Sequence, residues 1–239
     1  MAVGFEDYDA AIRAFWAGRN LQQQKQFDSG RIDSGTRGAV TGGLHLNALQ
    51  ELIARQFEPL VDLGVRVRSR GKLTLPGYYR RTKNWDIVVT YGDILVAAIE
   101  CKSQVGSFGN NFNNRTEEAI GNAVDLWRAN AQGFFGAVKP WLGFVFVLEY
   151  ADASVRVQRD TANLLYNADR MFDNSSYADR YQLLFQRLVR DGLYDAACFI
   201  RSVNGEGIYD EPLLELSTAN LTAAIAERVS FIQELGGSA

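Results

Sequence analysis

Residues 84–102, NWDIVVTYGDILVAAIECK, decide the fold. Two apolar runs separated by a polar turn predict a β-hairpin with strands at about 85–91 and 94–102. The second strand is apolar on both alternating faces until Glu100 and Lys102, so a strand suited to the interior ends by carrying two charges. Buried charges without partners cost several kcal/mol, so these two need a physical reason.

The spacing of three charged residues defines a possible site. Asp86 precedes Glu100 by thirteen intervening residues, and Lys102 follows in the pattern Glu-x-Lys. Because side chains alternate along a strand, Glu100 and Lys102 share a face and lie roughly 7 Å apart. A strict two-residue loop at Gly92-Asp93 would set Asp86 opposite Ile99, on the other face. A shared site therefore predicts a loop of odd length or a β-bulge.

The three side chains suit metal-assisted phosphodiester hydrolysis. Two converging carboxylates match the oxygen ligands of Mg²⁺, which keeps waters for substrate phosphate. A neighbouring lysine can orient or help deprotonate a water and compensate developing charge. The alternative is structural: a Glu–Lys pair at a strand end beside an ordinary strand-start aspartate, in a pattern short enough to arise by chance.

Composition bounds the class of protein. The chain has 239 residues, 47% of them hydrophobic and 22% charged, which predicts one domain over 1–239 with an N-terminal helix and loop and a C-terminal helical part. An acidic N-terminus and no long apolar run predict a soluble, cytoplasmic protein without a membrane partner. Two cysteines and one histidine exclude a disulfide framework and a Cys/His zinc site, so any metal must be held mainly by oxygen.

Positive charge is concentrated in one segment although the net charge is −3. Residues 65–85 contain no acid, and the rest of the chain has 18 bases against 28 acids. Such a footprint is typical of a surface that meets a polyanion, whereas outward-facing bases on a solvated strand are the alternative. The seven bases are Arg66, Arg68, Arg70, Lys72, Arg80, Arg81 and Lys83.

The remaining patterns predict an α/β fold with a mixed central sheet flanked by helices. Helices are expected at 7–24, 44–63, 176–202 and 218–235, and further strands at 65–75 and 141–150. Polar loops are expected at 25–43 and 103–115, the second closed by a helix that Asn114 caps and Glu117 reaches back to.

Longer blocks carry a family likeness. The hairpin resembles the PD-(D/E)xK nuclease motif with Trp85 in place of the proline. The blocks LTLPGYYRRTKNWD, AAIECKSQVGSFGNNFNNRTEEAIG, YADRYQLLFQRLV and QKQFDSGRIDSGTRGAVTGG resemble the XhoI family of Type II restriction endonucleases. The resemblance implies a restriction-endonuclease-like fold and a Mg²⁺-dependent homodimer. That dimer would cut duplex DNA at CTCGAG, leave 5′-phosphate ends and work beside a methyltransferase of the same system.

The same resemblance implies roles for individual residues. Asp86 and Glu100 would bind metal together with the main-chain carbonyl of Cys101, and Lys102 would be the catalytic lysine. No thiol chemistry is implied for Cys101.

Several polar residues are candidates for DNA contact. Arginine, lysine, asparagine and glutamine side chains read the edges of nucleobases. Basic side chains that contact phosphates add salt-dependent affinity. The alternatives are turn formation and helix capping for asparagines, and solvated side chains for bases. The candidates are Ser103, Gln104, Asn110, Asn111, Asn113, Asn114 and Arg115 after the catalytic strand, Arg80, Arg81 and Lys83 before it, and Lys25, Arg31 and Arg37 near the N-terminus.

Four further residues have blander interpretations. Glu51 fits an exposed helix position better than a third carboxylate of the site. Glu117 fits a capping box, His45 fits a structural role, and Trp85 fits a position in the core. Two other functions stay open: a repair or recombination nuclease that reads DNA structure, and a catalytically silent DNA-binding relative.

Overall fold

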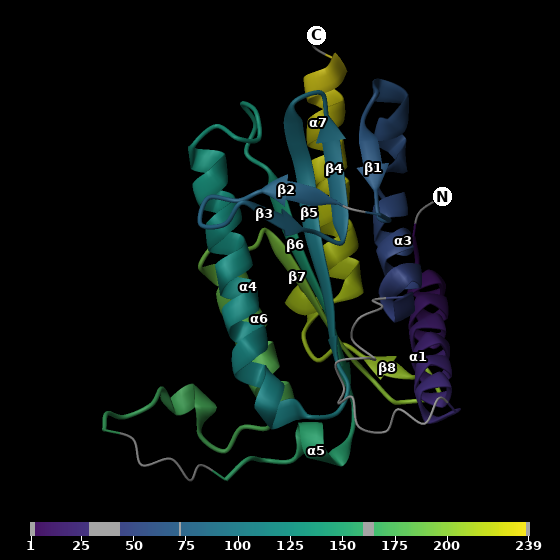
Figure 1. The fold of residues 1–239 in the computed structure, drawn as a ribbon, viewed down its shortest axis with the longest axis vertical. Coiled ribbons are helices and arrows are strands. Elements are labelled where there is room, and N and C mark those ends of the chain that lie inside the picture. The colour runs from purple at the N-terminus through teal and green to yellow at the C-terminus, as the bar shows by residue number, and fades with distance from the viewer. Residues whose placement is uncertain (1–2, 29–43, 72, 160–164, 238–239) are drawn as a thin grey trace.

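The computed structural model describes residues 3–28, 44–71, 73–159 and 165–237. In these ranges a mixed β-sheet lies between two groups of helices (Figure 1). The strands are β1 (Arg66–Arg68), β2 (Thr74–Pro76), β3 (Thr82–Asn84), β4 (Ile87–Tyr91), β5 (Ile94–Gln104), β6 (Trp141–Glu149), β7 (Ala196–Ser202) and β8 (Tyr209–Asp210). The helices are α1 (Phe5–Asp28), α3 (Asn47–Arg55), α4 (Phe108–Ala131), α5 (Asp152–Val155), α6 (Tyr177–Arg190) and α7 (Thr218–Gly237), with 3₁₀ turns η1 (Leu44–Leu46), η2 (Glu58–Leu63), η3 (Arg170–Phe172) and η4 (Leu214–Leu216).

The central sheet has six strands in the order β1-β4-β5-β6-β7-β8 among the described residues. Strands β5, β6 and β7 run parallel, and the pairs β1–β4, β4–β5 and β7–β8 are antiparallel. The parallel strands are buried on both faces, which explains their near-continuous apolar sequences. Strands β2 and β3 form a separate antiparallel hairpin, which crosses in front of the sheet in Figure 1.

Alternation along the strands sorts side chains into two cores. On β6, Val145 and Val147 pack with α1, α3 and α7, whereas Phe144 and Phe146 pack with α4 and α6. Aromatic rings fill the second core, where the Phe146 and Tyr181 centroids are 4.5 Å apart. The predicted α/β fold with a mixed sheet flanked by helices is confirmed.

Several element predictions were wrong in detail. Residues 196–202 form β7, not the end of a helix. The segment AACFIRS pairs with β6 in the sheet, and helices cover both faces of the strand. The expected strand at 65–75 is two strands in different sheets, β1 and β2. The helix expected at 44–63 ends at Arg55, and the 3₁₀ turn η2, with Pro59 near its start, follows it.

The predicted loop 103–115 is also shorter than expected. Strand β5 continues to Gln104, and α4 begins at Phe108 with Ser107 as its N-cap residue. Asn114 therefore does not cap this helix, and Glu117 is an exposed residue within it. Burial of Phe108 against the second core outweighs the turn preference of the glycines and asparagines. None of the helices in the described ranges combines the length and the apolar character that a membrane crossing needs.

Candidate active site

A β-bulge aligns the charged residues of the β4–β5 hairpin. The turn is the two-residue loop Gly92-Asp93, since Tyr91 pairs with Ile94, but the register shifts between Val89 and Thr90. Val89 pairs with Ala97 and Thr90 with Leu95, so Val96 is the extra residue on β5. Beyond the bulge Ile87 pairs with Ile99. The same register sets Asp86 opposite Glu100, and the predicted irregularity is confirmed.

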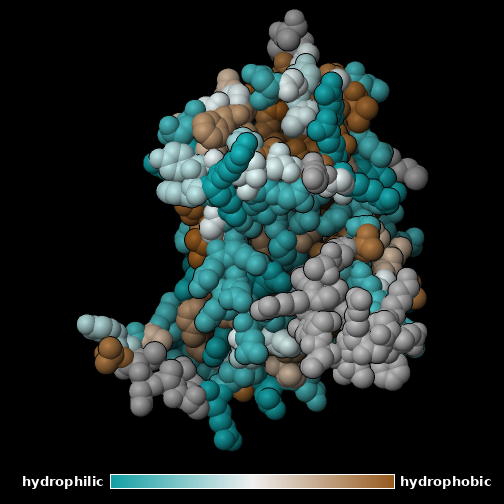
Figure 2. Space-filling view, viewed as in Figure 1, coloured by the Kyte–Doolittle hydropathy of each residue, from teal (hydrophilic) through white to brown (hydrophobic). Residues whose placement is uncertain are grey.

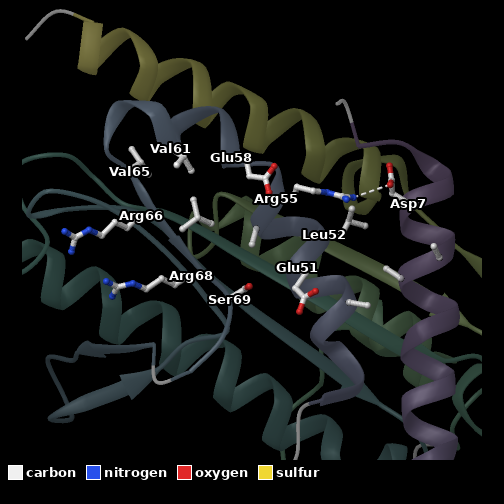
Figure 3. Close-up of a pocket in the computed structure, with 15 residues that line it drawn as sticks. Asp7, Glu51, Leu52, Arg55, Glu58, Val61, Val65, Arg66, Arg68 and Ser69 are labelled. Atoms are coloured by element: carbon white, nitrogen blue, oxygen red, sulfur yellow. Dashed lines mark hydrogen bonds and ion pairs between the residues drawn. The ribbon is translucent and has the colours of Figure 1, made fainter.

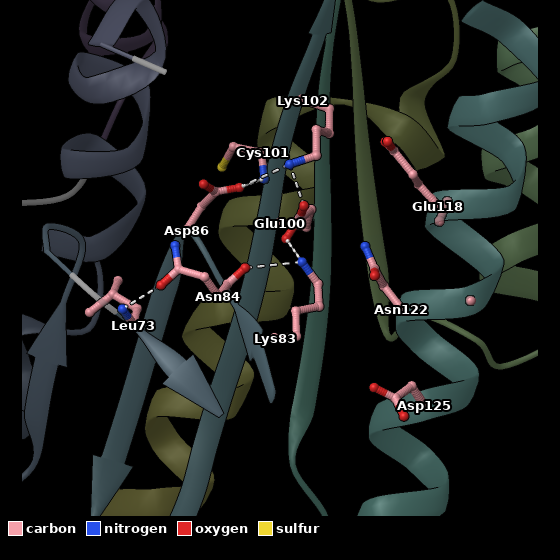
Figure 4. Close-up of polar contacts among 12 residues, drawn as sticks. Leu73, Lys83, Asn84, Asp86, Glu100, Cys101, Lys102, Glu118, Asn122 and Asp125 are labelled. Atoms are coloured by element: carbon pink, nitrogen blue, oxygen red, sulfur yellow. Dashed lines mark hydrogen bonds and ion pairs between the residues drawn. The ribbon is translucent and has the colours of Figure 1, made fainter. Parts of the chain in front are cut away.

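The bulge brings three side chains to the face of the sheet that packs against α4 (Figure 4). Lys102 Nζ forms an ion pair with Glu100 Oε1 and lies 3.8 Å from Asp86 Oδ2. The main-chain N–H of Cys101 donates to Asp86 Oδ2 at 2.8 Å, which fixes that carboxylate against β5. Asp86, Glu100 and Lys102 therefore form one polar cluster, as the spacing predicted.

Burial differs within the cluster. The Glu100 side chain is 2% exposed, whereas those of Asp86 and Lys102 are 25% and 28% exposed. A buried carboxylate needs counter-charges, and Glu100 has two, because Lys83 Nζ lies 2.8 Å from its Oε2. Both carboxylate oxygens of Glu100 thus contact a lysine ammonium. The sequence marked Lys83 only as a candidate DNA contact, since nothing local to it indicates a partner seventeen residues away.

The electrostatics of the cluster keep Lys102 protonated. Burial raises the pKa of Asp86, and the negative charge of Glu100 raises it further. Burial alone would lower the pKa of Lys102, but the charges of Glu100 and Asp86 outweigh it, so the pKa lies above its usual value. Lys102 is therefore a stable ammonium that can orient a water or a phosphate oxygen.

The donor set fits a hard divalent cation. Asp86, Glu100 and the Cys101 carbonyl offer only oxygen, the ligand that Mg²⁺ prefers. Among the described residues no group of three His, Cys, Asp or Glu side chains is placed to hold a metal alone. Waters or substrate phosphate would therefore complete the coordination of a metal at this site, as is usual for Mg²⁺.

The Cys101 thiol belongs to the opposite face. It is 1% exposed and packs with Val145 in the first core, and burial raises its pKa well above the usual value. The thiol therefore lies on the face of the sheet away from the carboxylate cluster.

The β2–β3 hairpin is fastened to α4 beside the cluster. The Asp125 carboxylate accepts hydrogen bonds from the main-chain N–H groups of Tyr78 and Tyr79 at 2.8 Å and 2.7 Å, and from Arg80 Nε at 2.7 Å. Arg80 also donates to the Asn122 side-chain oxygen at 3.0 Å. The predicted DNA contact Arg80 thus has partners within the chain although its side chain is 42% exposed, and Arg81 on the same hairpin is also exposed.

The other predicted DNA contacts fall into three groups. Ser103 and Gln104 belong to β5, where the Ser103 hydroxyl lies 3.2 Å from His45 Nε2 and Gln104 is 4% exposed. The residues that follow belong to the first turns of α4, with Asn110, Asn113 and Asn114 exposed and Asn111 and Arg115 half-buried. Hydrophilic side chains dominate the face over α4 in Figure 2. The side chains of Lys25, Arg31 and Arg37 lie outside the described residues.

Glu51, Trp85 and His45 lie as expected, whereas Glu117 does not form the predicted capping box. Glu51 on α3 is 43% exposed and pairs with Arg70, away from the cluster. Trp85 is 3% exposed and packs in the second core. His45 is 6% exposed, and burial followed by the positive charge of Arg19 lowers its pKa to about 4, which fits a structural role.

A pocket of about 1010 Å³ lies elsewhere, between α1, α3 and the edge strand β1 (Figure 3). Glu51, Arg55, Arg66 and Arg68 line it, and no residue of the carboxylate cluster does. This pocket is open to solvent and contains none of Asp86, Glu100 and Lys102, so it is separate from the candidate site.

Comparison with known proteins points to one family. The model of the restriction endonuclease XhoI family matches residues 25–210. The chain is 41% identical over 201 residues to the Type II restriction enzyme XhoI of Xanthomonas vasicola, which covers 80% of this chain and 79% of that protein. It is 38% identical over 195 residues to the Type II restriction enzyme BstVI of Geobacillus stearothermophilus, with 77% and 86% covered.

A third relative agrees with these two. The Type II restriction enzyme AbrI of Azospirillum brasilense is 41% identical over 180 residues, covering 68% of this chain and 76% of its own. No solved structure matches the chain. The match over 25–210 includes the bulged hairpin, the carboxylate cluster and the fastened β2–β3 hairpin. The chain belongs to the XhoI family of Type II restriction endonucleases.

Proposed function

We propose that this protein is a Mg²⁺-dependent endonuclease that cuts double-stranded DNA at a short palindrome and leaves 5′-phosphate ends. The observation that carries the proposal is the convergence of Asp86, Glu100 and Lys102 on one face through the bulge at Val96. By resemblance the palindrome is CTCGAG. Residues 1–239 act as one PD-(D/E)xK domain within a cytoplasmic homodimer, beside a methyltransferase that protects host DNA.

Each residue has a role in this proposal. Asp86, Glu100 and the Cys101 carbonyl hold the cation, which when bound polarises a phosphate oxygen and acidifies a water. Lys102 orients the attacking water and offsets the charge that builds on the phosphate. The Cys101 N–H keeps Asp86 aimed at the cluster. A two-fold dimer presents one such cluster to each strand of a palindrome.

The proposed DNA surface lies beside this cluster. Asn110, Asn113 and Asn114 recur at helical spacing on the exposed side of α4, where their amides can reach base edges. Arg81 is an exposed basic residue of the hairpin and suits a phosphate contact. The other candidates have partners or burial within the chain, so they stabilise this surface from beneath it. They are Ser103, Gln104, Asn111, Arg115 and Arg80.

The test uses two plasmids that differ by a single CTCGAG site, incubated with Mg²⁺ or with chelator. We expect one cut in the plasmid with the site, only with Mg²⁺. Cutting both plasmids alike would refute sequence specificity, and cutting neither would favour a silent DNA-binding relative. Glu100→Ala should abolish cleavage yet keep DNA binding in a gel-shift assay, whereas the control Glu227→Gln, at an exposed carboxylate on α7, should cleave.

A further inference from the structure

Lys83 occupies the second oxygen of the most buried carboxylate in the cluster. Its ammonium lies 2.8 Å from Glu100 Oε2 and 3.1 Å from the carbonyl of Asn84, and its side chain is 11% exposed. Figure 4 shows Lys83 and Lys102 reaching Glu100 from different strands. The two oxygens of Glu100 thus each contact a different lysine ammonium.

Charge balance sets a limit on what this arrangement can accept. Asp86 and Glu100 carry two negative charges, and Lys83 and Lys102 carry two positive ones, so the four side chains are neutral together. A divalent cation added among them leaves an excess of two positive charges in a partly buried site, which is costly. In the absence of substrate phosphate, a bound cation therefore favours the departure of one lysine from its carboxylate oxygen.

Lys83 is the lysine better placed to leave. Lys102 is shared between Glu100 and Asp86 and lies on the same strand as Glu100, whereas Lys83 reaches Glu100 from β3 of the separate hairpin. Its ammonium also lies 4.6 Å from the centroid of the Trp85 ring, a face that attracts a cation and can keep it nearby.

The hairpin itself stays in place during such a move. Asp125 fastens its turn to α4, and β2 pairs with β3 so that Leu75 lies opposite Lys83. Only the Lys83 side chain has to swing. The movement would carry the Lys83 ammonium toward the surface where a phosphate group of DNA would approach the cluster.

We propose that Lys83 is a positioning residue that holds Glu100 Oε2 while no divalent cation is bound, competes with the cation for that oxygen, and is released to a DNA phosphate when the cation binds. This inference rests on the proposed metal-dependent function of the cluster. Lys83 then acts as a built-in substitute for the cation, which keeps the buried carboxylate compensated in the resting protein.

The test is a calorimetric titration of Mg²⁺ into the full-length protein without DNA, so that no turnover takes part. Lys83→Met removes the competitor, and Mg²⁺ should bind at least about tenfold more tightly, the worth of one charged hydrogen bond. In chelator the same variant should melt several degrees below the wild type, and saturating Mg²⁺ should close that gap. Lys83→Arg keeps the charge and should bind Mg²⁺ as the wild type does.

The matched control is Arg81→Met, an exposed base two residues away on the hairpin, which should change neither the affinity nor the melting temperature. If Lys83→Met is too unstable without metal, Lys83→Gln keeps hydrogen-bond donors and should give an intermediate tightening. Equal Mg²⁺ affinity in wild type, Lys83→Met and Lys83→Gln would overturn the inference alone. No Mg²⁺ binding by the wild type, or binding unchanged by Glu100→Gln, would overturn the proposed metal site as well.

Discussion

Arg80 and Asp125 join two parts of the chain that are 45 residues apart, through a contact of 2.7 Å between Arg80 Nε and Asp125 Oδ2. The Asp125 side chain is 5% exposed, and three donors from the hairpin converge on it. Burial would raise the pKa of Asp125, but these hydrogen bonds outweigh it and hold the pKa below the usual value. The contact fixes the hairpin that carries Lys83 against the helix that carries the exposed asparagines.

Removing the Asp125 carboxylate should loosen the attachment of the β2–β3 hairpin to α4. Asp125→Ala leaves the N–H groups of Tyr78 and Tyr79 and the guanidinium of Arg80 without their acceptor, so we expect the free energy of unfolding to fall by about 3 kcal/mol. Urea denaturation measures this, and cleavage should weaken in parallel. The exposed Glu117→Gln on the same helix should cost less than about 0.5 kcal/mol. Equal stability of the two variants would contradict a structural role for Asp125.

The glycine of the same hairpin tests the contact from the other side. A Cβ added at Gly77 would lie 2.6 Å from Asp125 Oδ2 and 2.8 Å from the Arg80 carbonyl, so Gly77→Ala must push the two apart. We expect a loss of about 1–3 kcal/mol in the free energy of unfolding, typical of overpacking. In contrast, a Cβ at Gly121 on α4 meets nothing within 4 Å, so Gly121→Ala is the control and should not destabilise. A fully stable Gly77→Ala protein would mean that the hairpin is not tightly fastened.

Stability should depend on pH through His45. Its pKa falls from 6.5 to about 4 on folding, so the unfolded chain binds the proton more readily between these values. The stabilisation is complete above pH 6.5 and declines as pH falls toward 4, by at most ~1.4 kcal/mol per pH unit. Denaturation curves of wild type and His45→Gln between pH 7 and 5 should therefore converge as pH falls. Parallel curves would show that His45 does not titrate as proposed.

The exposed asparagines of α4 should govern specificity. If Asn113 reads a base edge, Asn113→Ala should lower the ratio of the cleavage rate at CTCGAG to the rate at sites with one altered base. The loss of discrimination should correspond to about 1–3 kcal/mol. Asn130→Ala, near the other end of the same helix, should leave the ratio unchanged. Competition cleavage of mixed substrates gives the ratio directly, and an unaltered ratio for Asn110, Asn113 and Asn114 variants alike would exclude this face from base reading.

Salt dependence separates phosphate contacts from base contacts. Arg81→Ala should weaken binding to all duplexes alike and make the slope of log affinity against log salt shallower by about one. Arg13→Ala on α1, whose side chain pairs with Asp9, should not alter the slope. Fluorescence anisotropy at a series of salt concentrations measures both, and identical slopes for wild type and Arg81→Ala would remove Arg81 from the DNA surface.

The sequence predicted the parts of the site that depend on strand parity. Alternation placed Glu100 and Lys102 on one face, and the count of residues to Asp86 required the irregularity that Val96 supplies. It could not locate the bulge, because bulges follow from packing of both faces. The pairs Lys83–Glu100 and Arg80–Asp125 were also out of reach, since they join segments that only the three-dimensional fold brings together.

The errors have a common physical origin. Small apolar residues in β7 and asparagines at the start of α4 have weak or contrary local preferences, and burial against the second core decides their conformation. Local pattern is reliable where a segment's own periodicity matches its surroundings, as in β4, β5 and β6. It fails where neighbours distant in sequence supply most of the stabilisation.

The bulge at Val96 also constrains how this hairpin can evolve. A single-residue insertion or deletion between Asp86 and Glu100 would reverse the parity and turn one carboxylate toward the opposite core. Changes of two residues, or a loss at the bulge offset by a gain in the turn, would keep it. Selection on a functional cluster would therefore act on whether the number of intervening residues is odd, while the side chains between them remain free to vary within the limits of packing.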